Sequence, residues 1–143
     1  MHNRKILIIG EVYVDQHLDI IENGYSTSRL GGIFHAARSC DALNIEYALA
    51  YYAPDYLVKD VEKFGIDVLR ASSIFRLGKV DKAPNVMLIG QSDESGNQLY
   101  ENILGRQAEY VSMLPFMQVL DDFDPTDICL LYTSPSPRDG LLS

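Results

Sequence analysis

Two acidic residues near the start of the chain have the chemistry needed to bind hydroxyl groups. Glu11 follows directly after an apolar run that ends at Gly10, and Asp15 comes four residues later. A carboxylate accepts two charge-assisted hydrogen bonds from a vicinal diol, and ligands of open α/β sheets bind beyond the carboxyl ends of strands. Asp15 is therefore a candidate polyol-binding residue. From its position alone, the alternative is a solvated hairpin residue.

A pair of glycines, Gly31 and Gly32, stands at the start of a helical pattern. Glycine lets a ligand approach the backbone closely, and the first N–H groups of a helix are free to bond the oxygens of a phosphate or a sugar hydroxyl. The pair is a second candidate for ligand binding. The alternative is an ordinary tight turn into a helix.

The elements that must position these residues begin with a strand. The unbroken apolar run Lys5–Gly10 is typical of a strand buried on both faces of a parallel sheet. Asn23-Gly24 predicts a hairpin turn after it. After the glycine pair, apolar residues recur at helical spacing and predict an amphipathic helix. These residues are Ile33, Ala36, Ala37, Cys40 and Leu43.

A second strand and helix follow. Tyr47–Tyr52 is a strand candidate, and Pro54 begins a helix that we expect Gly65 to end. Its apolar stripe consists of Leu57, Val58, Val61 and Phe64. This alternation of strands and helices predicts an α/β fold.

The remaining elements are expected to add a small sheet and to complete the core. Strands are predicted at Ile74–Val80, Asn85–Gln91 and Gln98–Ile103, the last two joined by a polar turn at residues 92–97. Met113–Phe123 is helical in pattern, with an interruption expected at Pro115, and Asp127–Tyr132 is a buried-type strand.

The pattern divides the chain into a folded part, residues 1–132, and a tail, residues 133–143. The tail has two closely spaced prolines and no apolar periodicity, so it is expected to be disordered. Residues 130–139 also resemble a translated sequencing adapter, which would make the tail an artefact. A natural flexible C-terminus is the alternative.

Composition excludes several classes of function. A formal net charge of −8 without a basic cluster argues against nucleic-acid binding. The apolar runs are far shorter than the roughly 20 residues of a membrane span, so a cytoplasmic protein without membrane contact is expected. Cys40 and Cys129 lack metal-type spacing and are interpreted as small hydrophobic residues.

Known catalytic and metal-binding patterns are missing. The sequence has neither a phosphate-binding P-loop nor a dinucleotide fingerprint, and its histidines have no zinc spacing. A group of four aspartates is interpreted as a solvated helix end rather than a metal site. It comprises Asp121, Asp122, Asp124 and Asp127. No catalytic residue and no metal ligand are assigned.

The order Gly10-Glu11, Asp15, hairpin, Leu30-Gly31-Gly32 and Ala-rich helix resembles the entry region of ribokinase (PfkB) family carbohydrate kinases. The resemblance implies a three-layer ribokinase-like (Rossmann-like) α/β sheet with a small β lid. It also implies that Asp15, Gly31 and Gly32 bind sugar hydroxyls. The family usually has an asparagine where Ala36 stands here, and His35 is a candidate for the missing polar contact, with a solvated surface role as the alternative.

The resemblance further implies phosphate transfer from ATP, with Mg²⁺, to a hydroxyl of a sugar or related polyol. Family members are longer and carry a Gly-Ala-Gly-Asp-type motif that this chain lacks. We therefore expect a fragment, truncated at the C-terminal side, that has the sugar-binding half-site but no catalytic base or ATP site. Such a fragment should be inactive and poorly stable.

A homodimer through the lid strands is also compatible with the resemblance. Two other functions remain open from the sequence. One is a naturally short, non-catalytic α/β domain that binds a small molecule or regulates a partner, and the other is a fragment of a nucleoside kinase.

Overall fold

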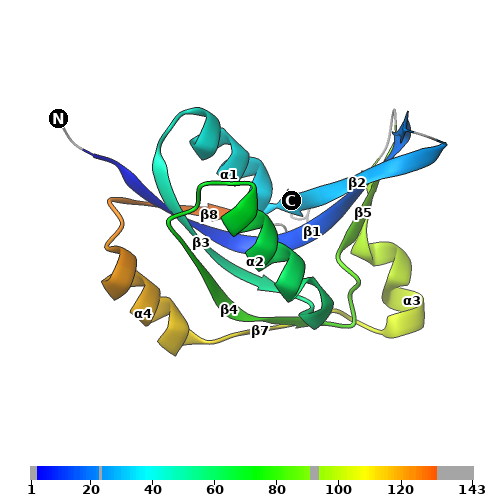
Figure 1. Ribbon diagram of the computed structural model, residues 1–143. Helices are drawn as coiled ribbons and strands as arrows, with labels where there is room; N and C mark the ends of the chain where they lie inside the picture. The colour runs from blue at the N-terminus through cyan, green and yellow to red at the C-terminus, as the bar shows by residue number, and fades with distance from the viewer. Residues whose placement is uncertain (1–2, 23, 91–93, 132–143) are drawn as a thin grey trace, which may run out of the picture.

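The computed structural model describes residues 3–22, 24–90 and 94–131. Its central element is β1 (Lys5–Glu22), an 18-residue strand that belongs to two sheets in succession (Figure 1). The first part of β1 pairs in parallel with β3 (Glu46–Ala53) and β8 (Asp127–Leu131). The second part pairs antiparallel with β2 (Tyr25–Gly32) and parallel with β5 (Val86–Ile89).

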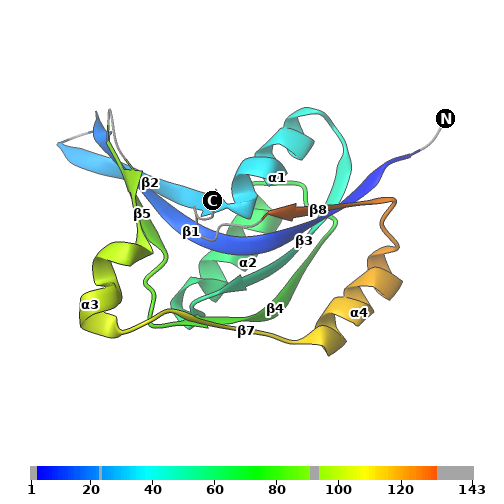
Figure 2. The ribbon, with the colours of Figure 1, turned by 180° about the vertical axis from the view of Figure 1, so that it is seen from behind.

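Two further strands extend the parallel sheet, and one extends the small sheet. β4 (Ser73–Asp81) pairs in parallel with β3, and β7 (Ala108–Val111) pairs antiparallel with β4. β6 (Glu94–Ser95) pairs antiparallel with β5. The small sheet therefore consists of β2, β5, β6 and the second part of β1, and it projects from one end of the core (Figures 1 and 2).

Helices cover both faces of the parallel sheet. α1 (Ile33–Ala42) and α2 (Val58–Asp67) pack on one face, where Phe34 and Val61 share a cluster with Leu49 of β3. α4 (Met113–Phe123) packs on the other face through Val119 and Phe123 (Figure 2). The predicted three-layer α/β fold with a small second sheet is confirmed.

Alternating side chains of β1 and β3 explain the three layers. Ile8 and Leu49 are fully buried toward α1 and α2, while Leu7 and Ala48 are fully buried toward α4. Successive side chains of a strand point to opposite faces, so an unbroken apolar run buries both faces at once. This is the pattern that predicted the first strand.

Short helical turns complete the chain. A 3-10 turn, η1 (Asp55–Leu57), precedes α2, and a second 3-10 turn, η2 (Asn97–Tyr100), leads into α3 (Glu101–Leu104). The expectation of a strand at Gln98–Ile103 was therefore wrong. Apolar residues in this stretch recur three and four positions apart, which suits a helical turn, and Gly105 ends it at a φ of 89°.

Three details of the predicted helices also differ. Gly65 does not end α2, because the helix continues to Asp67 and the glycine lets it approach Ile74 closely. Pro115 does not interrupt α4, because it lies in the first turn, where the N–H has no helical partner to lose. Leu43, expected in the apolar stripe, lies just beyond α1 and is 70% exposed.

The two cysteines pack as small hydrophobic residues, and the four aspartates near the end of the chain are solvated, as the sequence predicted. Cys40 is buried in the cluster beneath α1, and Cys129 packs against the same cluster. Burial, followed by the nearby Cys129, raises the pKa of Cys40. Asp121, Asp122 and Asp124 at the end of α4 and Asp127 at the start of β8 are all exposed, and Asp127 pairs with Arg4 at 3.3 Å.

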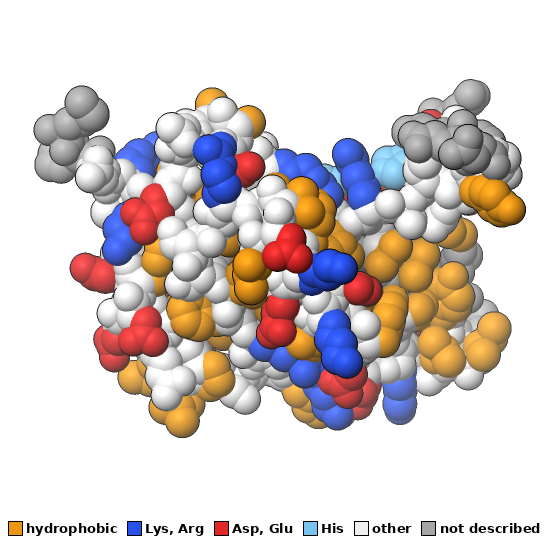
Figure 3. Space-filling model, viewed as in Figure 1, with side chains coloured by type: hydrophobic (Ala, Val, Ile, Leu, Met, Phe, Trp, Pro, Cys, Tyr) orange, Lys and Arg blue, Asp and Glu red, His pale blue; other side chains and the backbone are white. Residues whose placement is uncertain are grey.

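Apolar side chains remain exposed at the two ends of the molecule. On α3, Ile103 is 81% exposed, and on α4, Met113 and Leu114 are 65% and 68% exposed. Figure 3 shows hydrophobic side chains, in orange, at both ends of the face seen there. Within the described residues β8 pairs with β1 alone, and its Leu130 is 68% exposed. Within the same residues, no helix has the length and apolar character needed to cross a membrane. The predicted tail, residues 133–143, lies outside the described part.

Candidate functional site

The site begins where β1 leaves the parallel sheet. Along the odd-numbered positions of β1, the apolar Leu7 and Ile9 give way to a polar series. That series consists of Glu11, Tyr13, Asp15 and His17. Because alternate residues of a strand share a face, this change from apolar to polar marks a surface that lines something other than the core.

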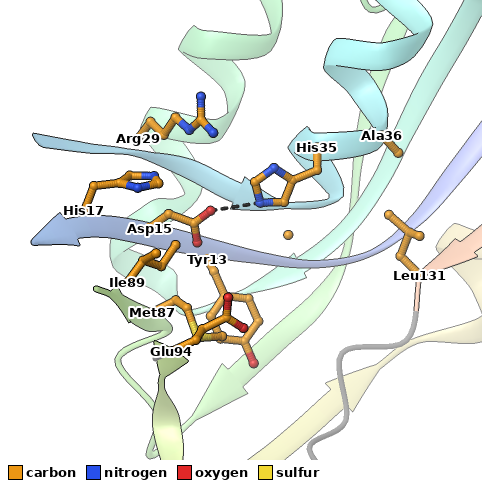
Figure 4. A pocket seen from close by; sticks show the side chains of 11 residues that line it. Tyr13, Asp15, His17, Arg29, His35, Ala36, Met87, Ile89, Glu94 and Leu131 are labelled. Atoms are coloured by element: carbon orange, nitrogen blue, oxygen red, sulfur yellow. Dashed lines mark hydrogen bonds and ion pairs between the residues drawn. The ribbon is translucent and has the colours of Figure 1, made fainter. Parts of the chain in front are cut away.

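A cavity of about 570 Å³ lies against this surface (Figure 4). Its walls come from four strands of the small sheet, β1, β2, β5 and β6, together with the start of α1 and the end of β8. The lining residues are Tyr13, Asp15, His17, Arg29, Gly32, His35, Ala36, Met87, Ile89, Glu94 and Leu131. The volume and the mixture of apolar walls with a few polar groups suit a small polar molecule.

Asp15 is the buried carboxylate of the cavity. Its exposure is 3%, so the alternative of a solvated hairpin residue is wrong. One carboxylate oxygen, Oδ2, lies 2.8 Å from Nε2 of His35 (Figure 4). The carboxylate is thus held in place by one partner while it still lines the cavity.

His35 reaches Asp15 from the first turn of α1. Its side chain is 53% exposed, yet the contact with Asp15 makes it more than a solvated surface residue. The neighbouring Ala36 also lines the cavity. The structure thus places a polar side chain, His35, beside Ala36 in the cavity wall, and a contact between His35 and a ligand stays a prediction.

The two glycines make this arrangement sterically feasible. A Cβ on Gly31 would lie 2.2 Å from Oδ2 of Asp15, so only glycine leaves room for the carboxylate. Gly32 has φ 63° and ψ −124°, and a Cβ there would lie 2.2 Å from the carbonyl oxygen of Glu11. Both glycines are required by local geometry, and only Gly32 itself lines the cavity.

The first turn of α1 begins at this glycine. Gly32 is the N-cap residue, no side chain caps the helix, and its first turn contains no acidic residue. Backbone N–H groups at an uncapped helix start are oriented to bond oxygen atoms. Because Gly32, His35 and Ala36 all line the cavity, this helix start lies at its wall.

A second polar cluster lies deeper, beside Glu11, and sequence reasoning missed most of it. Asn85 is fully buried, and its Nδ2 donates to Oε2 of Glu11 at 2.7 Å and to the carbonyl of Val12 at 2.8 Å. Two hydrogen bonds join Asn85 to Asn97. The backbone N–H of Asn85 donates to Oδ1 of Asn97 at 3.0 Å, and Nδ2 of Asn97 donates to Oδ1 of Asn85 at 2.9 Å. Gln107 also donates to Oε2 of Glu11, at 3.4 Å.

This cluster, the Glu11–Asn85 network, joins four segments of the chain. The backbone N–H of Val14 donates to the carbonyl of Asn85 at 2.7 Å, which ties the segment before β5 to β1. Asn85 has a φ of 54°, a conformation that asparagine adopts more readily than most residues. The network fixes the point at which β1 passes from one sheet to the other.

Comparison with known proteins gives a limited result. No protein-family model matches the chain, and no curated protein does either. A solved structure described as a "putative phosphofructokinase" from Staphylococcus aureus is 14% identical, with 92% of this chain and 44% of the other covered and a TM-score of 0.45. A microbiome-derived acarbose kinase is also 14% identical, with 78% and 37% covered and a TM-score of 0.39.

The chain spans less than half the length of these two proteins, 44% and 37% respectively. At 14% identity and with these TM-scores, neither likeness transfers a function or a substrate to this chain.

Proposed function

We propose that this chain carries the sugar-binding part of a carbohydrate kinase of the ribokinase (PfkB) type. The observation that carries the proposal is the buried Asp15 carboxylate, which lines a cavity with Gly32 and is held by His35. A carboxylate in this position accepts hydrogen bonds from two neighbouring hydroxyls of a polyol. Such a contact is strong because the acceptor is charged and shielded from water.

The apolar part of the cavity supports a sugar as the ligand. Met87 and Ile89 of β5 lie on the opposite wall from His35, where they could cover the carbon skeleton of a ring (Figure 4). Since β5 belongs to the small sheet, the proposal gives that sheet the role of a lid over the bound sugar. Polar groups on one wall and apolar groups on another are typical of small-molecule sites.

The phosphate-transfer step belongs to the proposal only as a property of the whole protein. ATP with Mg²⁺ would supply the transferred phosphoryl group and neutralise its charge. Among the described residues, no group of three or more His, Cys, Asp or Glu side chains could hold a metal ion. The proposal for this chain is limited to sugar binding, and it assigns none of the described residues to ATP, to Mg²⁺ or to a catalytic base.

Calorimetric titration of the chain with ribose, fructose, glucose and adenosine tests the proposal. At least one polyol should bind, and Asp15→Asn should weaken that binding by about 10- to 100-fold, since a hydrogen bond to a charged group contributes about 1.5–3 kcal/mol. Asp19→Asn is the matched control, because Asp19 is exposed on the same strand and does not line the cavity. Equal affinity of Asp15→Asn and wild type would remove Asp15 from the site.

Adenosine distinguishes the nucleoside kinase from the sugar kinase. Preferential binding of adenosine, lost in Asp15→Asn, would favour the nucleoside alternative. Polyol binding alone does not distinguish a fragment of a sugar kinase from a non-catalytic domain that binds a polyol. Phosphate transfer must therefore be measured in a longer protein that contains this sequence.

A further inference from the structure

Arg38 of α1 does not line the cavity, yet it joins this helix to the strand that leads into it. Its Nη2 donates a hydrogen bond to the carbonyl oxygen of Leu30, the residue directly before Gly31. In the hairpin, Leu30 of β2 pairs with Val14 of β1, the residue before Asp15. The contact therefore ties the second turn of α1 to the part of the hairpin that carries the Asp15 carboxylate.

One side of α1 contacts both strands of this hairpin. His35 and Arg38 are three residues apart on the helix, so their side chains are neighbours on its surface. His35 contacts Asp15 of β1 at 2.8 Å (Figure 4), and Arg38 contacts Leu30 of β2. Each strand of the hairpin is thus held by one polar side chain from the same helix.

The surroundings of the Arg38 guanidinium make its charge costly to keep. Its Cζ lies 5.8 Å from the ring centroid of Phe64 on α2, and that ring packs edge-to-face on Phe34 at 5.3 Å. Its Nη1 is buried and has no hydrogen-bond partner among the described residues. Burial, and then the charge of Arg29, lowers the pKa of Arg38, while the charge of Asp15 acts in the opposite direction. Because a buried donor without a partner costs free energy, stability alone does not explain an arginine here.

We propose that Arg38 is a positioning residue for the candidate site. By binding the Leu30 carbonyl, it sets the placement of α1 on the hairpin and, with it, the placement of His35. The inference rests on the proposed function, in which His35 holds the ligand-binding carboxylate. The connection between β2 and α1 needs such a contact, because β2 ends in two glycines and no side chain caps the helix.

Histidine-selective ¹H–¹⁵N NMR spectroscopy of the intact chain tests the inference without a ligand. The Nε2 signal of His35, assigned by its loss in His35→Gln, should report the contact with Asp15. Arg38→Met removes the donors but keeps a long side chain, and it should move this signal toward its position in Asp15→Asn. Circular dichroism checks that each variant is folded. Arg38→Gln takes the place of Arg38→Met if the methionine variant is not.

Titration calorimetry with the tightest-binding member of the ribose, fructose, glucose and adenosine panel measures the effect on affinity. Arg38→Met should weaken binding by about 5- to 10-fold, a coupling typical of residues in one contact network. In a His35→Ala background, Arg38→Met should change affinity by less than about twofold, because a positioning residue acts through the residue that it positions. Arg38→Lys retains a cationic donor and should recover part of the loss.

Arg70→Met is the matched control. Arg70 also donates to a backbone carbonyl of α1, that of Asp41 at 2.7 Å, but it does so near the C-terminal end of the helix and does not line the cavity. Arg70→Met should lower stability while it leaves both the His35 signal and the sugar affinity unchanged.

The outcomes separate this inference from the proposed function. An unchanged His35 signal in Arg38→Met would overturn the positioning role, whether or not a sugar binds. Equal losses of affinity with and without His35 would also overturn it, since they would show a general structural effect. Absence of binding by every sugar, with the His35 signal still dependent on Arg38, would overturn the proposed function and support the placement of His35 by Arg38.

Discussion

Two buried carboxylates four residues apart on β1 have opposite surroundings. Glu11, 2% exposed, lies in a network with Asn85 and Gln107, whereas Asp15, 3% exposed, has His35 as a partner and lines a cavity. A carboxylate surrounded by protein donors holds the fold together, while one that faces a cavity can accept bonds from a ligand. Burial alone therefore does not identify a functional acid, and the neighbouring space does.

The same strand serves both purposes because it changes sheets between the two residues. Glu11 is the last residue of β1 that pairs with β3, and Asp15 pairs with β2 and β5. The network fixes that transition, and the cavity lies just beyond it. On this account, variants of the network should mainly alter stability, and variants of the cavity should mainly alter binding.

The largest effect on stability is expected from Asn85→Ala. It removes both side-chain donations to β1, leaves the Glu11 carboxylate without its 2.7 Å donor, and places alanine at a φ of 54°. We expect the free energy of unfolding to fall by about 3 kcal/mol or more, measured by urea denaturation.

Asn44→Ala is the control for the backbone contribution. Asn44 also has a positive φ, 60°, but it is exposed and outside the network. It should cost only about 1 kcal/mol. Similar losses in the two variants would show that the network contributes little.

Gly31→Ala should lower both the stability of the fold and the affinity of the cavity, because it displaces the Asp15 carboxylate. The new Cβ would lie 2.2 Å from Oδ2 of Asp15, so the carboxylate must move from its position beside His35. We expect a loss of about 1–3 kcal/mol in unfolding free energy and weaker polyol binding. Gly24→Ala, with no atom within 4 Å of the added Cβ, should weaken only stability, through its φ of 82°. Unchanged binding in Gly31→Ala would contradict the close packing of the site.

Neutralising each carboxylate in turn tests the comparison itself. Glu11→Gln removes the charge that strengthens two hydrogen bonds and should cost about 1–2 kcal/mol of unfolding free energy without abolishing binding. Asp15→Asn should change stability by less than about 1 kcal/mol while it impairs binding, because groups kept for ligands seldom stabilise the fold. If calorimetry showed that Glu11→Gln impairs binding, and urea denaturation showed that Asp15→Asn impairs stability, Glu11 would be the binding residue and Asp15 the structural one.

Tyr51 gives the smallest predicted effect and represents a third environment. Tyr51 is fully buried and belongs neither to the Glu11–Asn85 network nor to the lining of the cavity. Its hydroxyl has no hydrogen-bond partner among the described residues. Tyr51→Phe should therefore leave stability at pH 7 unchanged or raise it by up to about 1 kcal/mol.

Burial, and then the charge of Glu62, raises the pKa of Tyr51 to about 12 from an ordinary value of 10.0. As the pH rises from 10 to 12, the unfolded chain loses this proton while the folded chain keeps it, so wild type loses stability that Tyr51→Phe retains. Urea denaturation at several pH values measures the difference. If the unfolding free energies of wild type and Tyr51→Phe changed in parallel with pH, the Tyr51 hydroxyl would be in contact with a hydrogen-bond partner or with water.

Local signals account for the parts of the fold and site that were predictable from the sequence. The run Lys5–Gly10 and the glycine pair each specify their own backbone, and Asp15 lies between them in the sequence. The antiparallel pairing of β1 with β2 agrees with the predicted hairpin, while Asn23 of its predicted turn lies outside the described residues. The Gln98–Ile103 stretch is too short for its apolar spacing to distinguish a strand from a helical turn, and the structure has η2 and α3 there.

Long-range contacts account for what was missed. Asn85 lies 74 positions from Glu11, so its role depends on the folded sheet and leaves no local pattern. Arg29 and His17 could have been inferred from period-2 alternation around Asp15, but only once the hairpin register was known. The cavity could not be predicted because its walls come from five strands and a helix.

A crystal structure of the chain with the tightest-binding polyol of the titration panel tests the central claim most directly. We expect two neighbouring hydroxyls within hydrogen-bond distance of the Asp15 carboxylate, with the Glu11–Asn85 network unchanged. A ligand bound elsewhere, or one whose hydroxyls contact Glu11 in place of Asn85, would contradict it.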